Sequence, residues 1–199
     1  MPARFSPKSY RIISYLLLHS KKLVSQKEIA QATKASPGLV SRVTGRLEEE
    51  GVLKRPFRTR VSLEYPEKAL VDWIGRRGIG SRKAFFARSE KVLEKTRHAH
   101  TLFSGAWLEQ PFLKTDLATV YVEPDFEPEK NMEEGVLRQL KSRVALIPAE
   151  DEFVFYGARK IGGELVVNPF LLYVDLASFG GTASTALQAI AEKYKFPRL

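Results

Sequence analysis

The sequence has no cysteine and few histidines, which restricts the kinds of site that it can build. Without cysteine the chain forms neither disulfides nor thiolate metal sites. His19, His98 and His100 are its only histidines, and there is no HExxH pattern. His98 and His100 lie two residues apart in a segment with a helical pattern, where their side chains would diverge. We therefore expect no metal site and no cofactor.

Catalytic loops and long apolar segments are missing as well. The sequence has no GxSxG elbow, no Walker loop and no GxGxxG pattern. The longest strongly apolar run near its start, residues 12–18, is too short to span a bilayer, and no cleavable signal follows it. We expect a soluble, cytoplasmic protein without a membrane partner. No long heptad pattern indicates a dimer, which leaves the oligomeric state open.

Positive charge is concentrated in the first half of the chain. Residues 1–100 hold 22 Lys and Arg against 9 Asp and Glu, whereas residues 101–199 hold 10 against 14. Basicity alone is equally consistent with a solvated surface. An apolar fraction of 44% in 199 residues is sufficient for the core of one large domain or two small ones.

Residues 25–51 have the pattern of a helix-turn-helix. Ser25 and Glu28 form a capping box, in which each side chain satisfies a backbone N–H group at the start of a helix. The pattern continues with a helix to Thr33, a turn at 34–35, a helix start at Ser36-Pro37, a helix over 38–50 and a stop at Gly51. Because the positive charge lies in the same half, this pattern favours nucleic acid as the ligand.

The second of these helices has a buried and an exposed face. Val40, Val43 and Leu47 recur at spacings of three and four, so we expect them to point into the core. The opposite face carries Ser41 and Arg42, which can bond base edges or phosphates. On the same face the sequence places Gly38 and Gly45, with Arg46 at the margin. Glycine costs a helix about 1 kcal/mol of stability relative to alanine, so Gly45 calls for an explanation. Either close approach to a groove or tight contact with a neighbouring helix would provide one.

A basic hairpin follows the helices. A strand begins at Val52-Leu53 and its partner covers 60–63, with a proline turn between them. The hairpin carries Lys54, Arg55, Arg58 and Arg60, which suits a wing that lies along phosphates or enters a minor groove. Together the two motifs predict a winged helix-turn-helix. Its candidate DNA-binding residues are Lys34, Ser36, Gly38, Ser41, Arg42, Gly45, Arg46, Lys54, Arg55, Arg58 and Arg60.

The rest of the chain predicts a mixed α+β domain. We expect domains at 1–64 (winged helix-turn-helix) and 81–199 (α+β), joined by a connecting helix and a glycine hinge at 65–80. Trp73 and the Phe85-Phe86 pair are predicted to lie in a core. The expected elements are strands at 84–87, 117–123 and 143–147, a hairpin of 153–156 with 164–167 around Gly162-Gly163, and helices from Ser89 toward His100 and over 104–110, 129–140, 169–177 and 182–194.

Part of the second half of the chain can be compared with the active-site motif of nucleotidyltransferases. Nucleotidyltransferases hold triphosphate with a Gly-Ser loop and Mg²⁺ with an Asp-x-Asp pair. Here Ser104-Gly105 has the reverse order, and the nearest acidic pair is Glu123 and Asp125, separated by a proline. An acidic turn explains this pair more simply. Asp175, in an apolar surround, is expected to be a cap or a salt-bridge partner.

As a set, these motifs resemble the AbiEi-type antitoxin and transcriptional-regulator family of type IV toxin–antitoxin systems. The resemblance rests on the winged helix and on residues 65–73, 102–106, 168–176 and 180–194. It implies repression of the protein's own operon through DNA binding upstream. It also implies a second domain shaped like a nucleotidyltransferase without its catalytic residues, which acts against a cognate toxin in the same pathway without a stable complex.

These observations favour a non-enzymatic repressor that binds a double-stranded DNA operator. Two other functions are also compatible with the sequence. The first is a nucleotidyltransferase-like enzyme that uses Glu123 and Asp125. The second is a protein-interaction module, in which the wing's cations face an acidic partner.

Overall fold

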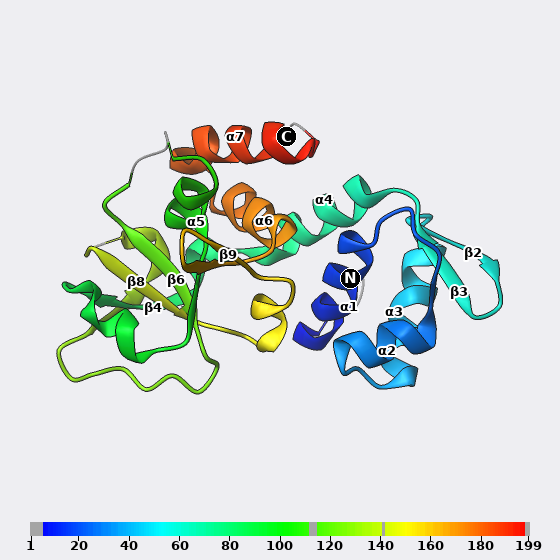
Figure 1. The fold of residues 1–199 in the computed structure, drawn as a ribbon, viewed down its shortest axis with the longest axis horizontal. Coiled ribbons are helices and arrows are strands. Elements are labelled where there is room, and N and C mark those ends of the chain that lie inside the picture. The colour runs from blue at the N-terminus through cyan, green and yellow to red at the C-terminus, as the bar shows by residue number, and fades with distance from the viewer. Residues whose placement is uncertain (1–5, 112–114, 141, 198–199) are drawn as a thin grey trace. The chain divides into compact units, whose positions relative to one another are not determined.

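The protein folds as two compact units, residues 1–72 and 73–199 (Figure 1). The computed structural model describes residues 6–111, 115–140 and 142–197. Every helix in this part of the chain is too short or too polar to cross a bilayer. The boundary between the units falls within α4 (Pro66–Arg77).

The first unit is a winged helix-turn-helix. Its elements are α1 (Pro7–Leu18), β1 (Val24–Ser25), α2 (Gln26–Thr33), α3 (Pro37–Glu49), β2 (Leu53–Phe57) and β3 (Arg60–Leu63). The strands form an antiparallel sheet in the order β1-β3-β2. Ile12 and Leu16 of α1, Ile29 of α2 and Val40 of α3 are at most 1% exposed and form the centre of this core. Their helical spacing explains why one face of each helix is buried.

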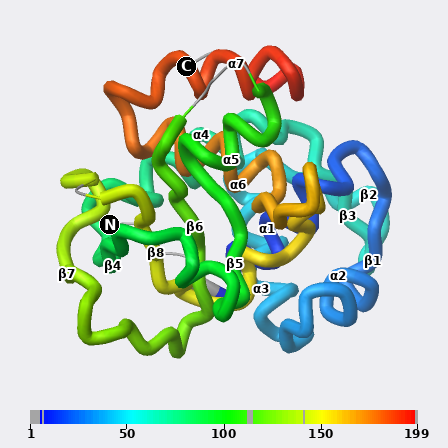
Figure 2. Tube along the Cα trace, turned by 60° about the vertical axis from the view of Figure 1, so that its left-hand side comes forward, coloured from blue at the N-terminus to red at the C-terminus, as the bar shows by residue number. Residues whose placement is uncertain are grey.

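The second unit is built on a seven-stranded mixed sheet in the order β7-β4-β8-β6-β5-β10-β9. Its strands are β4 (Lys83–Ala87), β5 (His98–His100), β6 (Ala118–Val122), β7 (Glu133–Val136), β8 (Val144–Pro148), β9 (Arg159–Ile161) and β10 (Glu164–Val166). The pairs β6–β8 and β5–β10 are parallel, and the others are antiparallel. Figure 2 shows β5, β6 and β8 side by side.

Both faces of the sheet's centre are covered. Helices α5 (Leu102–Glu109), α6 (Pro169–Phe179) and α7 (Ser184–Tyr194) pack together above one face (Figure 1). On the other face an apolar cluster that includes Val120 and Leu146 is covered by Val92, Leu93 and Phe126. The described structure therefore confirms an N-terminal winged helix-turn-helix followed by a mixed α+β domain.

A buried polar network fixes the end of α4 in the second unit. The Arg77 side chain, 1% exposed, donates through Nε to Asp175 Oδ1 at 2.8 Å and through Nη1 to Glu150 at 2.8 Å, and it also contacts the Tyr121 hydroxyl. Asp175 Oδ2 accepts from Tyr121 and Thr101, both at 2.8 Å. Burial raises the pKa of Tyr121, so its hydroxyl keeps the proton that it donates. Asp175 is thus a salt-bridge partner, as predicted.

Three predicted elements of the second unit are wrong. Residues 90–95 form a 3₁₀ helix and the chain then enters β5, so no helix reaches His100. The predicted helix over 129–140 is replaced by β7 and a short 3₁₀ turn, because Glu133–Val136 pairs with β4. The first strand of the hairpin around Gly162-Gly163 is Arg159–Ile161, whereas residues 153–156 lie in or follow a 3₁₀ turn.

Other predictions for this unit are confirmed. Trp73, Phe85 and Phe86 are at most 6% exposed. Gly162 and Gly163 both take positive φ, at 60° and 92°, as the turn between β9 and β10 requires.

Candidate nucleic-acid interface

Local hydrogen bonds fix the two helices of the helix-turn-helix. The Ser25 hydroxyl accepts from the Glu28 N–H at 3.1 Å, and Glu28 Oε2 accepts from the Ser25 N–H at 2.6 Å, which confirms the capping box. Lys34 makes the turn with a left-handed backbone, φ 51°. Ser36 caps α3 by accepting from the Leu39 N–H, with Pro37 in the first turn. The turn between α2 and α3 and the first residue of α3 are therefore determined by residues close in sequence.

The outward face of α3 carries exposed residues. Val40, Val43 and Leu47 are at most 3% exposed, as expected, whereas Ser41 and Arg42 are exposed. A Cβ atom added to Gly45 would meet no described atom within 4 Å, and the same is true of Gly38. Contact with a neighbouring helix within the described residues therefore does not explain Gly45. Because Gly38 and Gly45 have no side chain, an external ligand can come close to the backbone on this face of the helix.

The wing differs from its prediction in where it turns. β2 continues through Lys54, Arg55 and Pro56 to Phe57, and the chain reverses at Arg58-Thr59. Pro56 lies in an irregular part of the ladder between Lys54 and Phe57, where a missing N–H donor is tolerated. The predicted proline turn is therefore wrong, and Arg58 lies at the hairpin tip itself.

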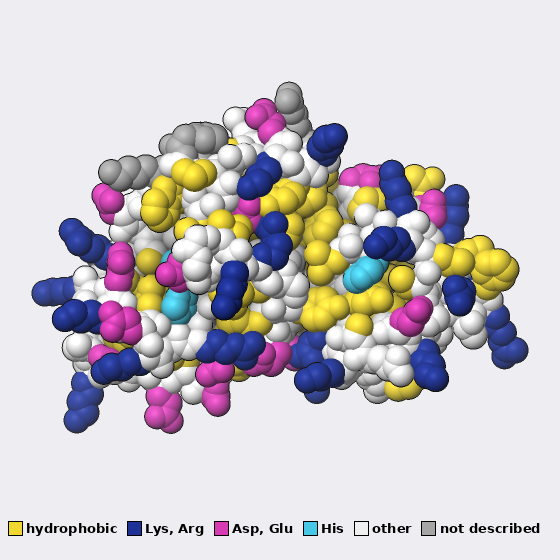
Figure 3. Space-filling model, viewed as in Figure 1, with side chains coloured by type: hydrophobic (Ala, Val, Ile, Leu, Met, Phe, Trp, Pro, Cys, Tyr) yellow, Lys and Arg dark blue, Asp and Glu magenta, His cyan; other side chains and the backbone are white. Residues whose placement is uncertain are grey.

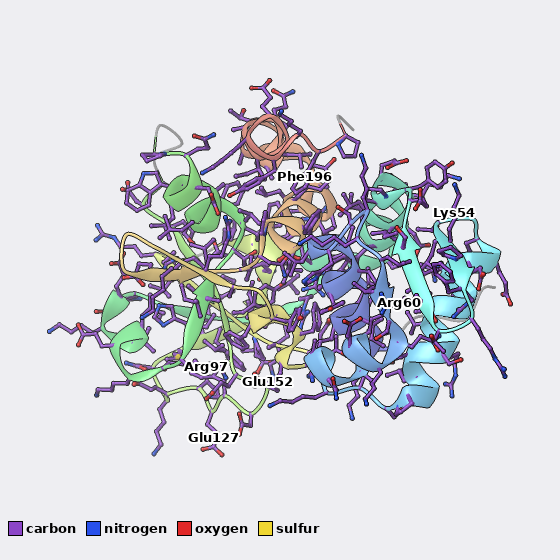
Figure 4. All side chains as sticks on the ribbon, turned by 45° about the vertical axis from the view of Figure 1, so that its right-hand side comes forward. Lys54, Arg60, Arg97, Glu127, Glu152 and Phe196 are labelled. Atoms are coloured by element: carbon purple, nitrogen blue, oxygen red, sulfur yellow. The ribbon has the colours of Figure 1, made fainter. Side chains whose placement is uncertain are left out.

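Figure 3 shows hydrophobic and basic side chains together at the hairpin's end. Phe57, 60% exposed, is next to the tip and was missed by the sequence analysis. Its signal in the sequence is an aromatic residue among four cations, which helps a wing to pack on sugars or in a minor groove. Lys54 and Arg60 lie on the two strands of the hairpin (Figure 4), and Lys54 approaches Glu64 at 3.8 Å.

Thr44 joins the wing, α2 and α3. Its hydroxyl accepts from Gln26 Nε2 at 2.8 Å and from Arg55 Nη2 at 3.3 Å, and lies 3.2 Å from the Ser41 carbonyl, to which it donates. Arg55 also forms an ion pair with Glu48 through Nε at 2.8 Å. We call Gln26, Ser41, Thr44, Glu48 and Arg55 the Thr44 network. It holds the base of the wing against α3.

The candidate cations fall into two groups. Arg55 pairs with Glu48, and Arg46 pairs with Glu50 at 2.8 Å, so both are partly neutralised within the unit. In contrast, no ion pair within the described residues involves Arg42 or Arg58, and both are exposed. Lys34 and Arg60 are exposed as well, and so is the uncharged candidate Ser36.

Arg60 and its neighbour Thr59 interact with the first residues of α2. The charge of Arg60 contributes to lowering the pKa of Glu28, after the hydrogen bonds from Ser25. The Thr59 carbonyl next to it accepts from the Gln26 N–H at 3.0 Å. The hairpin turn is thus fixed to the first residue of α2, so the wing and both helices belong to one surface.

The pattern compared with nucleotidyltransferases is not assembled in the second unit. Ser104 is buried in α5, and a Cβ atom on Gly105 would lie 3.2 Å from the His100 backbone, so this segment is close-packed. Asp125 is exposed in the turn after β6, and Glu123 is 3.6 Å from Arg97. Figure 4 shows Arg97 close to Glu152, its other partner at 3.2 Å.

The two neighbouring histidines are placed differently from the prediction. They lie on β5, where residues two apart share a face, so the expectation that their side chains diverge is wrong. Their rings are 5.5 Å apart between centroids, and Glu164 lies beside both. Burial and the nearby His98 lower the pKa of His100 to about 4.

Comparison with known proteins supports the DNA-binding surface. Residues 6–54 match the family described as winged helix-turn-helix DNA-binding. No curated protein matches the chain. The family match covers α1 to the start of β2 and thus includes both helices of the helix-turn-helix. The first unit is a DNA-binding domain of the kind found in regulators.

Proposed function

We propose that the protein is a non-enzymatic repressor that binds an operator upstream of its own operon, as an antitoxin of the type named above does. One observation carries this proposal. The outward face of α3 presents Ser41 and Arg42 without an acidic partner among the described residues, beside a wing with Arg58 at its tip. A major groove is wide enough for such a helix, and a flanking wing then reaches the backbone.

In this complex α3 enters the major groove with its N-terminal half leading. Arg42 reads a base edge, for which guanine is the preferred partner of arginine, and Ser41 bonds a base or a phosphate. Gly38 and Gly45 allow the backbone to come close. Lys34 and Ser36 lie at the N-terminal end of α3, where free N–H groups and the helix dipole favour a phosphate.

The wing and the paired arginines have different roles. Arg58 and Arg60 contact phosphates, Lys54 adds a weaker contact, and Phe57 packs beside them. Arg46 and Arg55 instead position the surface through their ion pairs with Glu50 and Glu48. The three acidic residues Glu48, Glu49 and Glu50 at the end of α3 are repelled by phosphates, which supports a docking led by the other end.

The antitoxin role is supported by the family resemblance described above. Ser104 and Gly105 lie in the packed helix α5 and form no phosphate-holding loop there, which supports a second domain that does not catalyse nucleotidyl transfer. Incubation with a labelled nucleoside triphosphate, Mg²⁺ and candidate acceptors tests this point. Metal-dependent transfer that is lost in Asp125→Ala would overturn the non-enzymatic assignment.

The DNA-binding proposal is tested with the region upstream of the protein's own gene. A reporter fused to this region should be repressed by the wild type and released by Arg42→Ala. In binding titrations Arg42→Ala should weaken binding to this region about tenfold or more, with little change on random DNA. Lys160→Ala, an exposed cation of the second unit, is the charge-matched control. Equal losses on both DNAs would make Arg42 a phosphate contact, and no binding to either at low salt would refute the proposal.

A further inference from the structure

Three side chains with metal-binding atoms meet on one face of the second unit's sheet. His98 and His100 lie on β5, and Glu164 begins the adjacent strand β10. Val166 is in register with His100 in this parallel pair, so Glu164, two residues earlier, lies beside His98 on the same face. The ligand atoms of all three residues lie within 4.8 Å of one another.

The distances suit ligands of one ion better than a direct ion pair. Glu164 Oε2 is 3.6 Å from Nε2 of His98 and 3.6 Å from Nε2 of His100. A good hydrogen bond between these atoms would be about 2.7–3.2 Å long. Two ligand atoms that each bind Zn²⁺ at about 2.1 Å with a tetrahedral angle lie roughly 3.4 Å apart. A small closure of the Glu164 side chain, which is 51% exposed, would bring both carboxylate–imidazole distances to that spacing.

The hydrogen bonds behind the rings direct Nε2 toward the carboxylate. His98 Nδ1 is 2.8 Å from the Thr96 carbonyl, which can only accept, so Nδ1 carries the proton. His100 Nδ1 is 2.9 Å from Ser104 Oγ, which accepts from the Thr119 N–H at 2.9 Å and lies 3.0 Å from the Thr119 carbonyl and 3.3 Å from the Thr101 carbonyl. With the Ser104 proton on either of these carbonyls, His100 Nδ1 is the donor. Both Nε2 lone pairs are left for a ligand, which is how oxygen acceptors orient metal-binding histidines.

We propose that His98, His100 and Glu164 bind one divalent first-row transition-metal ion, with Zn²⁺ as the preferred ion. Two imidazole nitrogens and one carboxylate suit Zn²⁺, whereas Mg²⁺ and Ca²⁺ prefer oxygen ligands. Because the chain has no cysteine, no thiolate competes for the ion.

Three protein ligands leave a coordination position for a water or a small anionic ligand. A cavity of about 480 Å³, lined by all three residues together with Trp107 and Asp116, provides room for it. The ion would also join β5 to β10 and so hold the β9–β10 hairpin on the sheet. Binding of the ion to the folded unit is therefore expected to stabilise it.

Zinc uptake by the untagged full-length chain tests this proposal. After the protein is stripped with a chelator, Zn²⁺ is titrated in competition with a chromophoric chelator, and Co²⁺ is used to record a visible ligand-field spectrum. We expect one ion per chain, with binding at submicromolar Zn²⁺ and no comparable binding of Mg²⁺. Thermal unfolding should move to higher temperature when Zn²⁺ is added.

Two ligand variants and one control separate this site from adventitious binding. His98→Asn keeps a donor for the Thr96 carbonyl but has no atom at the Nε2 position, and Glu164→Gln removes the charge. Both should weaken Zn²⁺ binding at least about a hundredfold, since loss of an outer partner alone costs 10–100-fold. His19→Asn is the matched control, because His19 Nδ1 also bonds a backbone carbonyl, that of Tyr15, at 2.8 Å.

The result that would overturn the proposal is a wild-type chain that takes up no Zn²⁺ at micromolar concentrations, or ligand variants that bind as tightly as the wild type. Circular dichroism of each variant without metal verifies that it is folded. The site lies in the second unit and is independent of the DNA-binding proposal, because a titration with DNA does not report on it. Failure of one proposal therefore leaves the other unchanged.

Discussion

Arginine has opposite environments in the two units. Arg77 in the second unit is buried and is bonded to Asp175, Glu150 and Tyr121. Arg58 in the first unit lies exposed at the wing tip, without an ion pair among the described residues. A buried guanidinium that is fully bonded serves the fold, whereas an exposed one is available to a phosphate. The comparison shows that the arginines of this chain include some that stabilise the fold and others that are available to a ligand.

The difference also appears in net charge. Residues 1–72 hold 14 Lys and Arg against 7 Asp and Glu, whereas residues 73–199 hold 18 against 16. The excess of positive charge therefore lies mainly in the unit with the helix-turn-helix, where it is available for steering toward a polyanion.

Removal of the buried guanidinium should give the largest effect. Arg77→Met leaves the Asp175 carboxylate buried without its cation, so the free energy of unfolding should fall by about 3–5 kcal/mol. Arg58→Met, the same change at an exposed site, should alter it by less than about 0.5 kcal/mol. Urea titrations of both variants measure this contrast. Adding Asp175→Asn to Arg77→Met should restore part of the loss, and an equal effect of the two single variants would contradict the comparison.

The wing arginines should instead control the salt dependence of DNA binding. Arg58→Ala and Arg60→Ala should each reduce the slope of log affinity against log salt by about one, and weaken binding to all sequences. Arg55→Ala should weaken binding with a smaller change of slope, because Arg55 is already paired with Glu48. Filter binding at several salt concentrations provides the slopes. An unchanged slope for Arg58→Ala would remove the wing from the interface.

Gly45 should separate stability from binding. Gly45→Ala places a Cβ atom in open space, so we expect the first unit to gain about 0.5–1 kcal/mol in stability. The same atom should weaken operator binding if the helix backbone lies close to the groove. Gly75→Ala is the matched control, since Gly75 is an exposed helical glycine with equally open surroundings. It should stabilise α4 without affecting binding. Unchanged binding by Gly45→Ala would refute close approach.

The smallest effect is expected at the capping box. Hydrogen bonds from Ser25 lower the pKa of Glu28, so the ionised carboxylate is more strongly favoured in the folded state than in the unfolded state. The stability that results is present above the unfolded pKa and is lost as pH falls through the folded one. The difference in unfolding free energy between the wild type and Glu28→Gln should therefore shrink as the solution is acidified below the usual carboxyl range. A constant difference would contradict this assignment.

Features that depend on neighbours in sequence were predictable. The Ser25 and Ser36 caps, the inward face of α3 and the turn at Gly162-Gly163 are each determined by residues within one or two turns. These local signals are strong enough to define the winged helix-turn-helix, so its outward face could be identified without coordinates.

Features that depend on distant partners were not predictable. Glu133 and Glu134 favour a helix, and only pairing with β4 makes their segment a strand. Likewise His98-Ala-His100 becomes a strand through β6, which reverses the predicted divergence of its rings. Thr44 has an ordinary helical context, and its contacts with Gln26 and Arg55 require the wing to be folded. Long-range packing therefore determined which polar residues met.

The parallel pairing of β5 with β10 has a consequence for synthesis of the protein. A ribosome releases the winged helix-turn-helix residues well before it adds Val166, the residue that aligns with His100. The DNA-binding unit can thus fold while the larger sheet still lacks its neighbouring strand. We expect nascent chains to acquire a protease-resistant N-terminal fragment first, with the second unit maturing only after translation of its last strand.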